Sequence, residues 1–303
     1  MTFSATVQQD LLTVRDWIRW GSTEFSKADL FYGHGTDNPW DEAIQLVLWV
    51  TRMPWERLEH IVDTRLTGDE KQQLLDLYQQ RIEQRLPAAY LTGTAYFAGL
   101  EFIVNRNVLV PRSPIAELIE QGFQPWLTEE PLRILDLCTG SGCIGIACAV
   151  AFPGAMVDLS DISSEALEIA TANVEKHELQ DQVSVVQSDL FSRLDHQYDL
   201  IVTNPPYVDA EDMKNLPQEF LVEPKLALES GDDGLDFTRR LLREAEEHLT
   251  ENGLLVVEVG NSWLALEEAF PSVPFTWLEL EQGGHGVFVM TKAQLCEFRA
   301  DFH

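Results

Sequence analysis

Residues 201–208, IVTNPPYV, run from an apolar, β-branched segment directly into two prolines. Proline cannot continue a central strand, so the strand should end there in a rigid corner that exposes carbonyl groups. The side-chain carbonyl of Asn204 can accept one N–H of a planar amide or aryl amine, and the carbonyl of Pro205 can accept the other. Pro206 restricts Pro205 to an extended conformation, and Tyr207 can cover the plane of the bound group. A plain turn would not require Asn and Tyr on either side.

This arrangement suits methyl transfer to nitrogen. The lone pair of an amide or aryl amine is delocalised, so the nitrogen is a poor nucleophile. Two acceptors that hold both N–H bonds aim the nitrogen at an electrophile and favour its loss of planarity. Catalysis then consists of positioning and of electrostatic stabilisation of the positive charge that develops. No strong base is required, and none is evident near the corner.

Three acidic residues end three successive predicted strands, and ligands of open α/β sheets bind beyond the carboxyl ends of the strands. Asp136 precedes a Gly-rich turn and is expected to hold a cationic group. Asp161 is placed to take two ribose hydroxyls, and Asp189 to face an adenine amine. Gly140 and Gly142 let the backbone approach a ligand closely. Together these residues indicate a nucleotide-type site, which the glycines alone would not.

Two other interpretations start from the same segment. The letters GSGCIG (140–145) satisfy the dinucleotide fingerprint, which raises a nicotinamide-dependent oxidoreductase as a rival. Cys138, Cys143 and Cys148 invite a metal site. Residues spaced five apart rotate by about 140° per step along a helix, so these thiols do not converge on one ion. We therefore expect no metal and assign the cysteines to packing.

The surrounding pattern predicts a small helical N-terminal domain (1–88), a β-hairpin linker (89–112) and a catalytic domain (113–303). Asn38 as N-cap and Pro39 at the first position predict a helix start, and residues 67–85 show helical periodicity. Beyond residue 132, strands and helices alternate, which is typical of a parallel, doubly wound sheet. The last two strands, separated by QGGHG (282–286), should form an antiparallel hairpin. The expected strands are 133–138, 155–162, 183–189, 198–204, 254–259, 275–281 and 287–291.

Charge and composition exclude several classes of protein. Fifty acidic residues against 21 basic ones give a net charge of −29, a balance that repels phosphate backbones. We therefore expect no direct binding of nucleic acid, and a basic protein as partner. No apolar run is long enough to span a membrane. The four cysteines and the absence of a secretory signal favour a reduced, cytoplasmic protein.

The order of the Gly-rich turn, the acid after the second strand, "SD" after the third and NPPY after the fourth resembles S-adenosylmethionine-dependent methyltransferases. Residues 85–112, 226–242 and 253–260 are similar to bacterial protein-glutamine methyltransferases, and the resemblance covers about residues 30–292. It implies a Rossmann-like class I fold, with a seven-strand sheet that ends in an antiparallel hairpin. It implies a glutamine amide held by Asn204, Pro205, Pro206 and Tyr207. The implied S-adenosylmethionine site comprises Asp136, Cys138, Thr139, Gly140, Ser141, Gly142, Asp161, Asp189, Leu190 and Asn204.

The segments PRSPIAEL (111–118) and YGHGTDNPWDEA (32–43) are similar to the branch that methylates the third protein of the large ribosomal subunit. Such a protein is basic, which agrees with the acidic charge of this chain. Two alternatives remain open: a methyltransferase of release factors, and a non-catalytic ribosome-assembly chaperone on the same fold.

Cys138 departs from the pattern of the family, which commonly has Gly at this position. If the backbone needs a positive φ there, a Cys costs about 1 kcal/mol or more.

Overall fold

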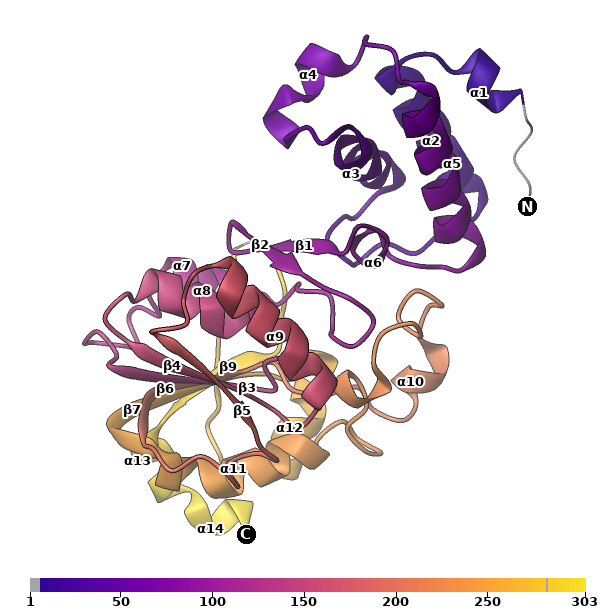
Figure 1. The fold of residues 1–303 in the computed structure, drawn as a ribbon. Coiled ribbons are helices and arrows are strands. Elements are labelled where there is room, and N and C mark those ends of the chain that lie inside the picture. Colours follow the sequence, from indigo (N-terminus) through magenta and orange to yellow (C-terminus); the bar gives the residue numbers. More distant parts are fainter. Residues whose placement is uncertain (1–5, 282) are drawn as a thin grey trace. The chain divides into compact units, whose positions relative to one another are not determined.

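The computed structural model describes residues 6–281 and 283–303, which divide into two units (Figure 1). The helical unit comprises the chain up to Thr94 together with Pro217–Val222, and the sheet unit comprises Ala95–Leu216 and Glu223–His303. This division differs from the expected boundaries at residues 88 and 112. The hairpin groups with the sheet unit almost from its start, and six residues from far along the chain join the helical unit.

The helices of the helical unit begin where the sequence provides caps. Asn38 accepts a hydrogen bond from the backbone N–H of Asp41 at 2.9 Å, and Pro39 occupies the first turn, as predicted. Thr13 and Thr67 each form a capping box. The elements are α1 (Val7–Asp10), α2 (Val14–Lys27), α3 (Pro39–Thr51), η1 (Trp55–Arg57), α4 (Leu58–Ile61), α5 (Gly68–Glu83) and α6 (Ala88–Thr92).

The core of the helical unit forms around Tyr78, which is fully buried. Its hydroxyl donates to the carbonyl of Trp17 at 3.2 Å, and its ring meets Phe25 edge to face, with 5.0 Å between the ring centroids. Gly21 makes this packing possible, because a Cβ there would lie 2.5 Å from Cε2 of Tyr78. The absence of a side chain at Gly21 thus sets how closely α2 and α5 approach.

The segment Pro217–Val222 belongs to the helical unit because it carries a buried charge. The carboxylate of Glu219 lies 3.3 Å from Nη1 of Arg81 and accepts a hydrogen bond from the backbone N–H of Phe31 at 3.2 Å. Arg81 is also buried and pairs with Glu42. A buried carboxylate is stable only with such partners. The ring of Phe220 packs against Phe31, with centroids 5.5 Å apart.

The sheet unit contains a seven-stranded sheet in the order β5-β4-β3-β6-β7-β9-β8. The strands from β5 to β7 pair in parallel, and β9 pairs antiparallel with both β7 and β8. The order of the seven predicted strands and the terminal antiparallel pair are confirmed, but the strand expected over 275–281 is limited to Thr276–Trp277. Gln282 of the connecting QGGHG lies outside the described residues. The strands are β3 (Arg133–Leu137), β4 (Met156–Asp161), β5 (Val183–Gln187), β6 (Tyr198–Thr203), β7 (Leu249–Glu258), β8 (Thr276–Trp277) and β9 (Val287–Thr291).

Helices cover both faces of this sheet (Figure 1). One face packs against α7 (Ile115–Glu120), α8 (Cys143–Ala151) and α9 (Ser164–Lys176), and the other against α11 (Asp236–His248), α13 (Lys292–Glu297) and α14 (Arg299–Phe302). No helix within residues 6–281 and 283–303 is both long and apolar enough to cross a membrane. The remaining elements are the hairpin β1 (Thr94–Phe97) and β2 (Leu100–Ile103), with α10 (Asp212–Asn215), η2 (Lys225–Ala227), η3 (Gly260–Ser262) and α12 (Trp263–Ala269).

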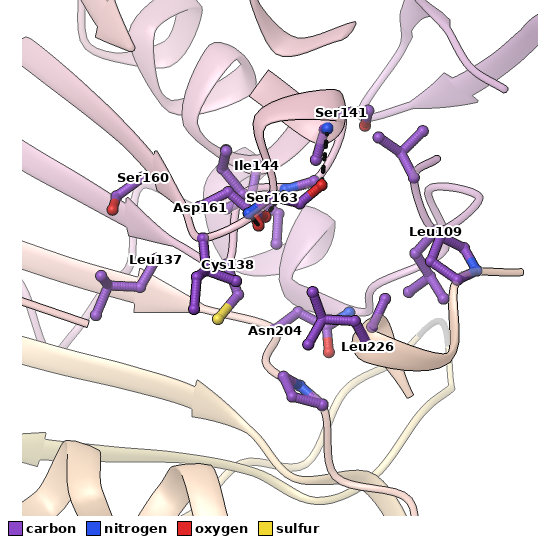
Figure 2. Close-up of a pocket in the computed structure, with 18 of the residues that line it drawn as sticks. Leu109, Leu137, Cys138, Ser141, Ile144, Ser160, Asp161, Ser163, Asn204 and Leu226 are labelled. Carbon is purple, nitrogen blue, oxygen red and sulfur yellow. Dashed lines mark hydrogen bonds between the residues drawn. The ribbon is translucent and has the colours of Figure 1, made fainter. Parts of the chain in front are cut away.

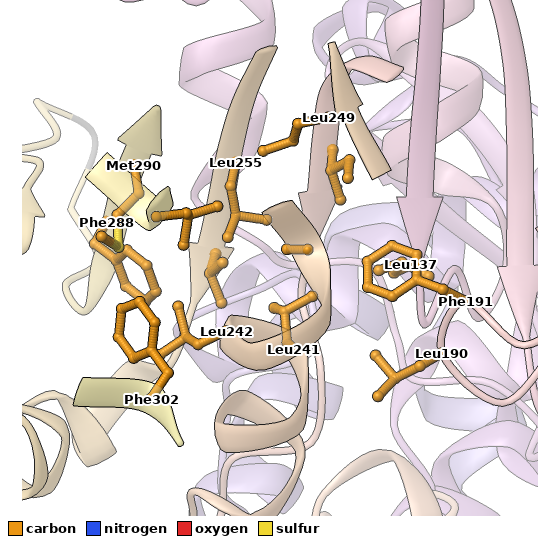
Figure 3. Packing of buried hydrophobic residues seen from close by; sticks show 14 of the residues in the cluster. Leu137, Leu190, Phe191, Leu241, Leu242, Leu249, Leu255, Phe288, Met290 and Phe302 are labelled. Atoms are coloured by element: carbon orange, nitrogen blue, oxygen red, sulfur yellow. The ribbon is translucent and has the colours of Figure 1, made fainter. Parts of the chain in front are cut away.

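One hydrophobic core of the sheet unit lies between the sheet and the helices of its second face (Figure 3). Leu241 and Leu242 of α11 point toward Leu255 of β7, and Phe288 of β9 packs beside Phe302 of the last helix. All five side chains are at most 2% exposed. Burial of apolar side chains on this scale, at roughly 1.5–3 kcal/mol each, holds the strands in one rigid sheet.

Substitution of Gly21 by Ala tests the packing of α2 on α5. The added methyl group would overlap the buried ring of Tyr78, so we expect a loss of about 2 kcal/mol in the free energy of unfolding, despite the better helix propensity of Ala. Urea unfolding measures this change. Gly68→Ala is the control, because no atom lies within 4 Å of a Cβ built there. Equal stability of the two variants would contradict this account of Gly21.

Candidate functional site

A cavity opens in the sheet unit at the carboxyl ends of β3, β4 and β6 (Figure 2). Figure 2 shows Cys138, Asp161 and Asn204, which follow or end three different strands, around the same hollow. The structure thus brings together residues that the sequence placed far apart. The predicted site residues that line the cavity are Cys138, Thr139, Gly140, Ser141, Asp161, Asp189, Leu190, Asn204 and Pro206. Asp136, Gly142, Pro205 and Tyr207 are not among the lining residues.

Asp136 lies behind the Gly-rich turn and does not face the cavity as expected. Its Oδ2 accepts hydrogen bonds from Oγ1 of Thr139 at 2.6 Å and from the backbone N–H of Gly145 at 2.8 Å. Burial raises the pKa of Asp136 to about 7, although these two hydrogen bonds lower it. The carboxyl group therefore braces the turn from inside. Gly142 closes the turn with a φ of +82°, which favours glycine.

Asp161 connects the turn to the end of β4. Its Oδ2 accepts from the backbone N–H of Gly140 at 3.0 Å, and its Oδ1 accepts from the backbone N–H of Ser163 at 2.9 Å. Burial raises the pKa of this carboxyl, while backbone hydrogen bonds from Ser163, Gly140 and Ile162 lower it. An ionised carboxylate has about four acceptor positions, so Asp161 can also accept a hydrogen bond from a ligand hydroxyl at the cavity.

Asp189 contacts a residue that the sequence did not identify. Nη2 of Arg240 donates to Oδ1 of Asp189 at 3.0 Å, and both side chains are about half exposed (47% and 51%). Arg240 lies in the second turn of α11 and lines the cavity. The sequence showed only a pair of basic residues, 239 and 240, with nothing to indicate which one faces the third strand. A ligand amine at Asp189 would share that carboxylate with Arg240.

Two lining residues have a left-handed backbone without being glycine. Cys138 has φ +55° and Leu190 has φ +48°, in a region that other residues rarely adopt. Each follows the end of a strand at the cavity. Such strain is found at binding sites, where the surrounding structure over-determines the backbone. The positive φ at Cys138 explains why Gly suits this position.

The NPPY corner presents one unpaired acceptor. Among the residues that the structure describes, Oδ1 of Asn204 is buried without a hydrogen-bond partner, and Asn204 and Pro206 line the cavity.

Tyr207 does not line the cavity, although it was expected to cover the plane of the bound group. Its ring packs against Gly260, where an added Cβ would lie 2.5 Å from Cε2 of the tyrosine. Its hydroxyl donates to Oε1 of Glu258 at 3.2 Å.

Residues 107–113, which the sequence assigned mostly to a linker, form a wall of the cavity. Arg112 makes two hydrogen bonds to the buried Glu223, from Nη1 at 2.7 Å and from Nη2 at 2.8 Å. The backbone N–H of Val110 donates to the same carboxylate at 3.0 Å. A bidentate pair of this kind fixes orientation as well as distance. The "PR" at 111–112 was the only sequence signal for this contact. It did not identify Glu223, the partner of Arg112, which lies more than a hundred residues further along the chain.

Comparisons with known proteins agree with this geometry. A family model described as "Methyltransferase small domain" matches residues 124–235. The "Ribosomal protein uL3 glutamine methyltransferase" of Francisella tularensis is 46% identical over 307 aligned residues, which cover 99% of this chain and 98% of that protein. Its namesake from Neisseria gonorrhoeae is 45% identical over 289 residues, 95% of this chain and 97% of the relative.

A solved structure is also similar in fold. The hMettl16 catalytic domain in complex with MAT2A 3'UTR hairpin 6 aligns with a TM-score of 0.52 at 19% sequence identity. The alignment covers 74% of this chain and 81% of that one. At this level of identity the likeness concerns the fold alone.

The raised pKa of Asp136 predicts a pH-dependent stability. Between about pH 4 and pH 7 the native protein keeps a proton on this carboxyl that the unfolded chain has released. The free energy of unfolding should therefore fall as pH rises through this window, by up to about 1.4 kcal/mol per pH unit. The Asp136→Asn variant lacks this contribution. Urea unfolding from pH 4.5 to 8 should show wild type losing stability relative to the variant until about pH 7. A difference in the free energy of unfolding that stays constant with pH would contradict the raised pKa of Asp136.

Substitution of Cys138 by Gly should relieve backbone strain. We expect a gain of about 1 kcal/mol, which corresponds to a rise of about 2–4 °C in Tm. Cys138→Ala keeps the Cβ and serves as the control for loss of the thiol. Cys138→Val should lower Tm, because a β-branched residue tolerates positive φ least. If Gly and Ala raised Tm equally, the thiol and not the backbone would be responsible.

Proposed function

The chain belongs to the family of ribosomal protein uL3 glutamine methyltransferases, and we propose that its cavity holds S-adenosylmethionine beside a glutamine side chain of that ribosomal protein. The sheet has the Rossmann-like class I methyltransferase architecture. The reaction moves one methyl group to the amide nitrogen, which releases one N–H proton to solvent, so that N(5)-methylglutamine, S-adenosylhomocysteine and a proton are formed. With a ribosomal protein as substrate, the proposed place of the reaction is the cytoplasm.

The observation that carries this proposal is the buried, unpaired Oδ1 of Asn204 at the cavity, identified among the described residues. A buried acceptor without a donor costs about 1–3 kcal/mol. An amide –NH₂ of a bound glutamine would satisfy it. The carbonyl of Pro205, the next residue, is the proposed acceptor for the second N–H. Two fixed acceptors also stabilise the positive charge that develops on the nitrogen.

The lining residues fit S-adenosylmethionine, which supplies an electrophilic methyl group on a sulfonium. Asp161 lines the cavity and is the proposed acceptor for the ribose hydroxyls. Asp189 and Leu190 mark the adenine end, together with Arg240. The turn from Cys138 to Gly142, with Thr139, Gly140 and Ser141, would lie along the rest of the molecule. Asp136 supports this turn from behind and makes no proposed contact.

The charge of the chain favours a basic protein as substrate over a nucleic acid. Most of the acidic residues lie in the sheet unit, which carries the cavity. Such a field speeds association with a basic protein and opposes a phosphate backbone. The curated relatives with the highest identity above are both described as acting on uL3. We therefore favour uL3 over release factors, and an enzyme over a non-catalytic chaperone.

Replacement of Asn204 by Ala separates an enzyme from a chaperone. Loss of one of two amide acceptors should lower the rate of methylation by about 100-fold or more, as for other preorganised hydrogen-bonding groups in active sites. Mass spectrometry of intact uL3 after incubation with S-adenosylmethionine measures the rate. Asn215→Ala, at an exposed position of α10, is the control and should retain the wild-type rate.

The same assay identifies the substrate. Wild-type protein should add one methyl group to uL3 and none to a release factor. Methylation of the release factor alone would keep the chemistry and overturn the choice of substrate. Wild-type rates in the Asn204→Ala variant would overturn the assigned role of this side chain.

A further inference from the structure

We propose that Glu258 is a positioning residue, whose buried carboxylate holds the hydroxyl of Tyr207 and thereby sets the orientation of the corner that presents Asn204. This inference rests on the proposed function, because it concerns the geometry of the same reaction. Glu258 ends β7, does not line the cavity and is 5% exposed. Its role must therefore act through a neighbour.

The carboxylate of Glu258 is shared by two hydroxyl groups from distant parts of the chain. Tyr207 donates to Oε1 at 3.2 Å, and Ser113 donates to Oε2 at 2.6 Å. Burial raises the pKa of Glu258, whereas the hydrogen bonds from Ser113 and Tyr207 and the charge of Arg112 lower it. A buried carboxylate is costly unless donors satisfy it. Ionised Glu258 is an acceptor at both oxygens and so holds both hydroxyls at once.

Ser113 is itself fixed, so that the carboxylate has a defined orientation. The backbone N–H of Ile115, the first residue of α7, donates to Oγ of Ser113 at 3.2 Å. Ser113 also lines the cavity. A continuous series of hydrogen bonds therefore runs from the start of α7 through Ser113 and Glu258 to Tyr207. The serine of the "PRSP" segment thereby acquires a structural partner that its sequence position does not suggest.

Tyr207 is held at three points by residues 258–262. Besides the hydroxyl contact with Glu258, its carbonyl accepts from Oγ of Ser262 at 2.7 Å. Its ring packs on Gly260, whose φ of +47° and missing side chain admit the close approach. A tyrosine with its hydroxyl, ring and carbonyl all held has little freedom left. The end of β7 and the start of η3 therefore form a frame for this residue.

The orientation of Tyr207 is transmitted to Asn204 by the two prolines. Proline fixes φ near −65°, so Pro205 and Pro206 leave few torsions free between the tyrosine and the asparagine. Displacement of the Tyr207 ring must then tilt the corner that carries Oδ1 of Asn204 and the carbonyl of Pro205. A misplacement of about 1 Å in such a site costs up to about 100-fold in rate. This connection gives the prolines a second use, beyond their exposed carbonyls.

A double-mutant cycle tests the proposal. Tyr207→Phe removes only the hydroxyl. Glu258→Gln keeps the shape of the side chain, but its amide replaces one acceptor oxygen by an –NH₂ donor, so it can accept a hydrogen bond from only one of the two hydroxyls. Each single variant should lower kcat for uL3 by about tenfold, with a smaller change in KM. The double variant should be no slower than the slower single variant, since both act through one contact. Cofactor affinity, measured by calorimetry, should stay at the wild-type value.

Two further variants guard against a loss of folding. Glu267→Gln removes a carboxylate that accepts a hydrogen bond from Trp277 at 2.9 Å, away from the cavity, and should leave kcat unchanged. Ser113→Ala removes the other hydroxyl donor and should lower kcat. If Glu258→Gln fails to fold, the cycle is run with Ser113→Ala and Tyr207→Phe, where non-additive losses are again expected.

The outcomes separate this proposal from the proposed function. Losses of kcat that multiply in the double variant would show that Glu258 and Tyr207 act independently, and would overturn the positioning role while the methyltransferase activity stands. A fall in cofactor affinity equal to the fall in kcat would overturn it in the same way. Wild-type protein that methylates no uL3 would refute the proposed function and the positioning role together.

Discussion

The parallel pairing of β3 with β4 and β6 is the constraint on which the site depends. Leu137 lies opposite Ser160 on one side and Thr203 on the other, so these three strands end at one edge of the sheet. The hydroxyl of Thr203 also donates to the carbonyl of Leu137 at 2.7 Å and ties β6 to β3. The residues that follow each strand therefore meet around one cavity. A shift of register by one residue would turn each of these side chains to the opposite face.

Buried carboxylates organise much of the remaining structure. Asp136 supports the Gly-rich turn, Glu223 holds the wall of the cavity, Glu258 holds the tyrosine of the NPPY corner and Glu219 anchors its segment in the helical unit. Asp136 receives its donors from the turn that follows it, and the other three receive theirs from distant parts of the chain. A strongly acidic protein thus uses some of its carboxyl groups as internal cross-links, because a buried acceptor selects the donors that satisfy it.

The fold could be predicted in outline because it follows from local patterns. Strand and helix periodicity identified the seven strands, and the short connection before Val287 identified the antiparallel pair. The caps at Asn38 and Thr67 depend only on neighbours within three residues. The inclusion of Pro217–Val222 in the helical unit could not be predicted in this way. It depends on contacts of Glu219 with residues more than a hundred positions earlier.

The sequence by itself determined the class of chemistry and nine of the residues that line the cavity, because a strand end followed by NPPY or by a Gly-rich turn is a local feature with a definite meaning. The tertiary structure alone decided how the predicted side chains are used. In the tertiary structure Asp136 accepts a hydrogen bond from Thr139 and does not line the cavity. Arg240 donates to Asp189, and Tyr207 donates to Glu258 and also does not line the cavity. Hydrogen-bond partners are chosen by distance in space and by the need to satisfy buried polar groups. Neither quantity can be read from the order of residues along the chain.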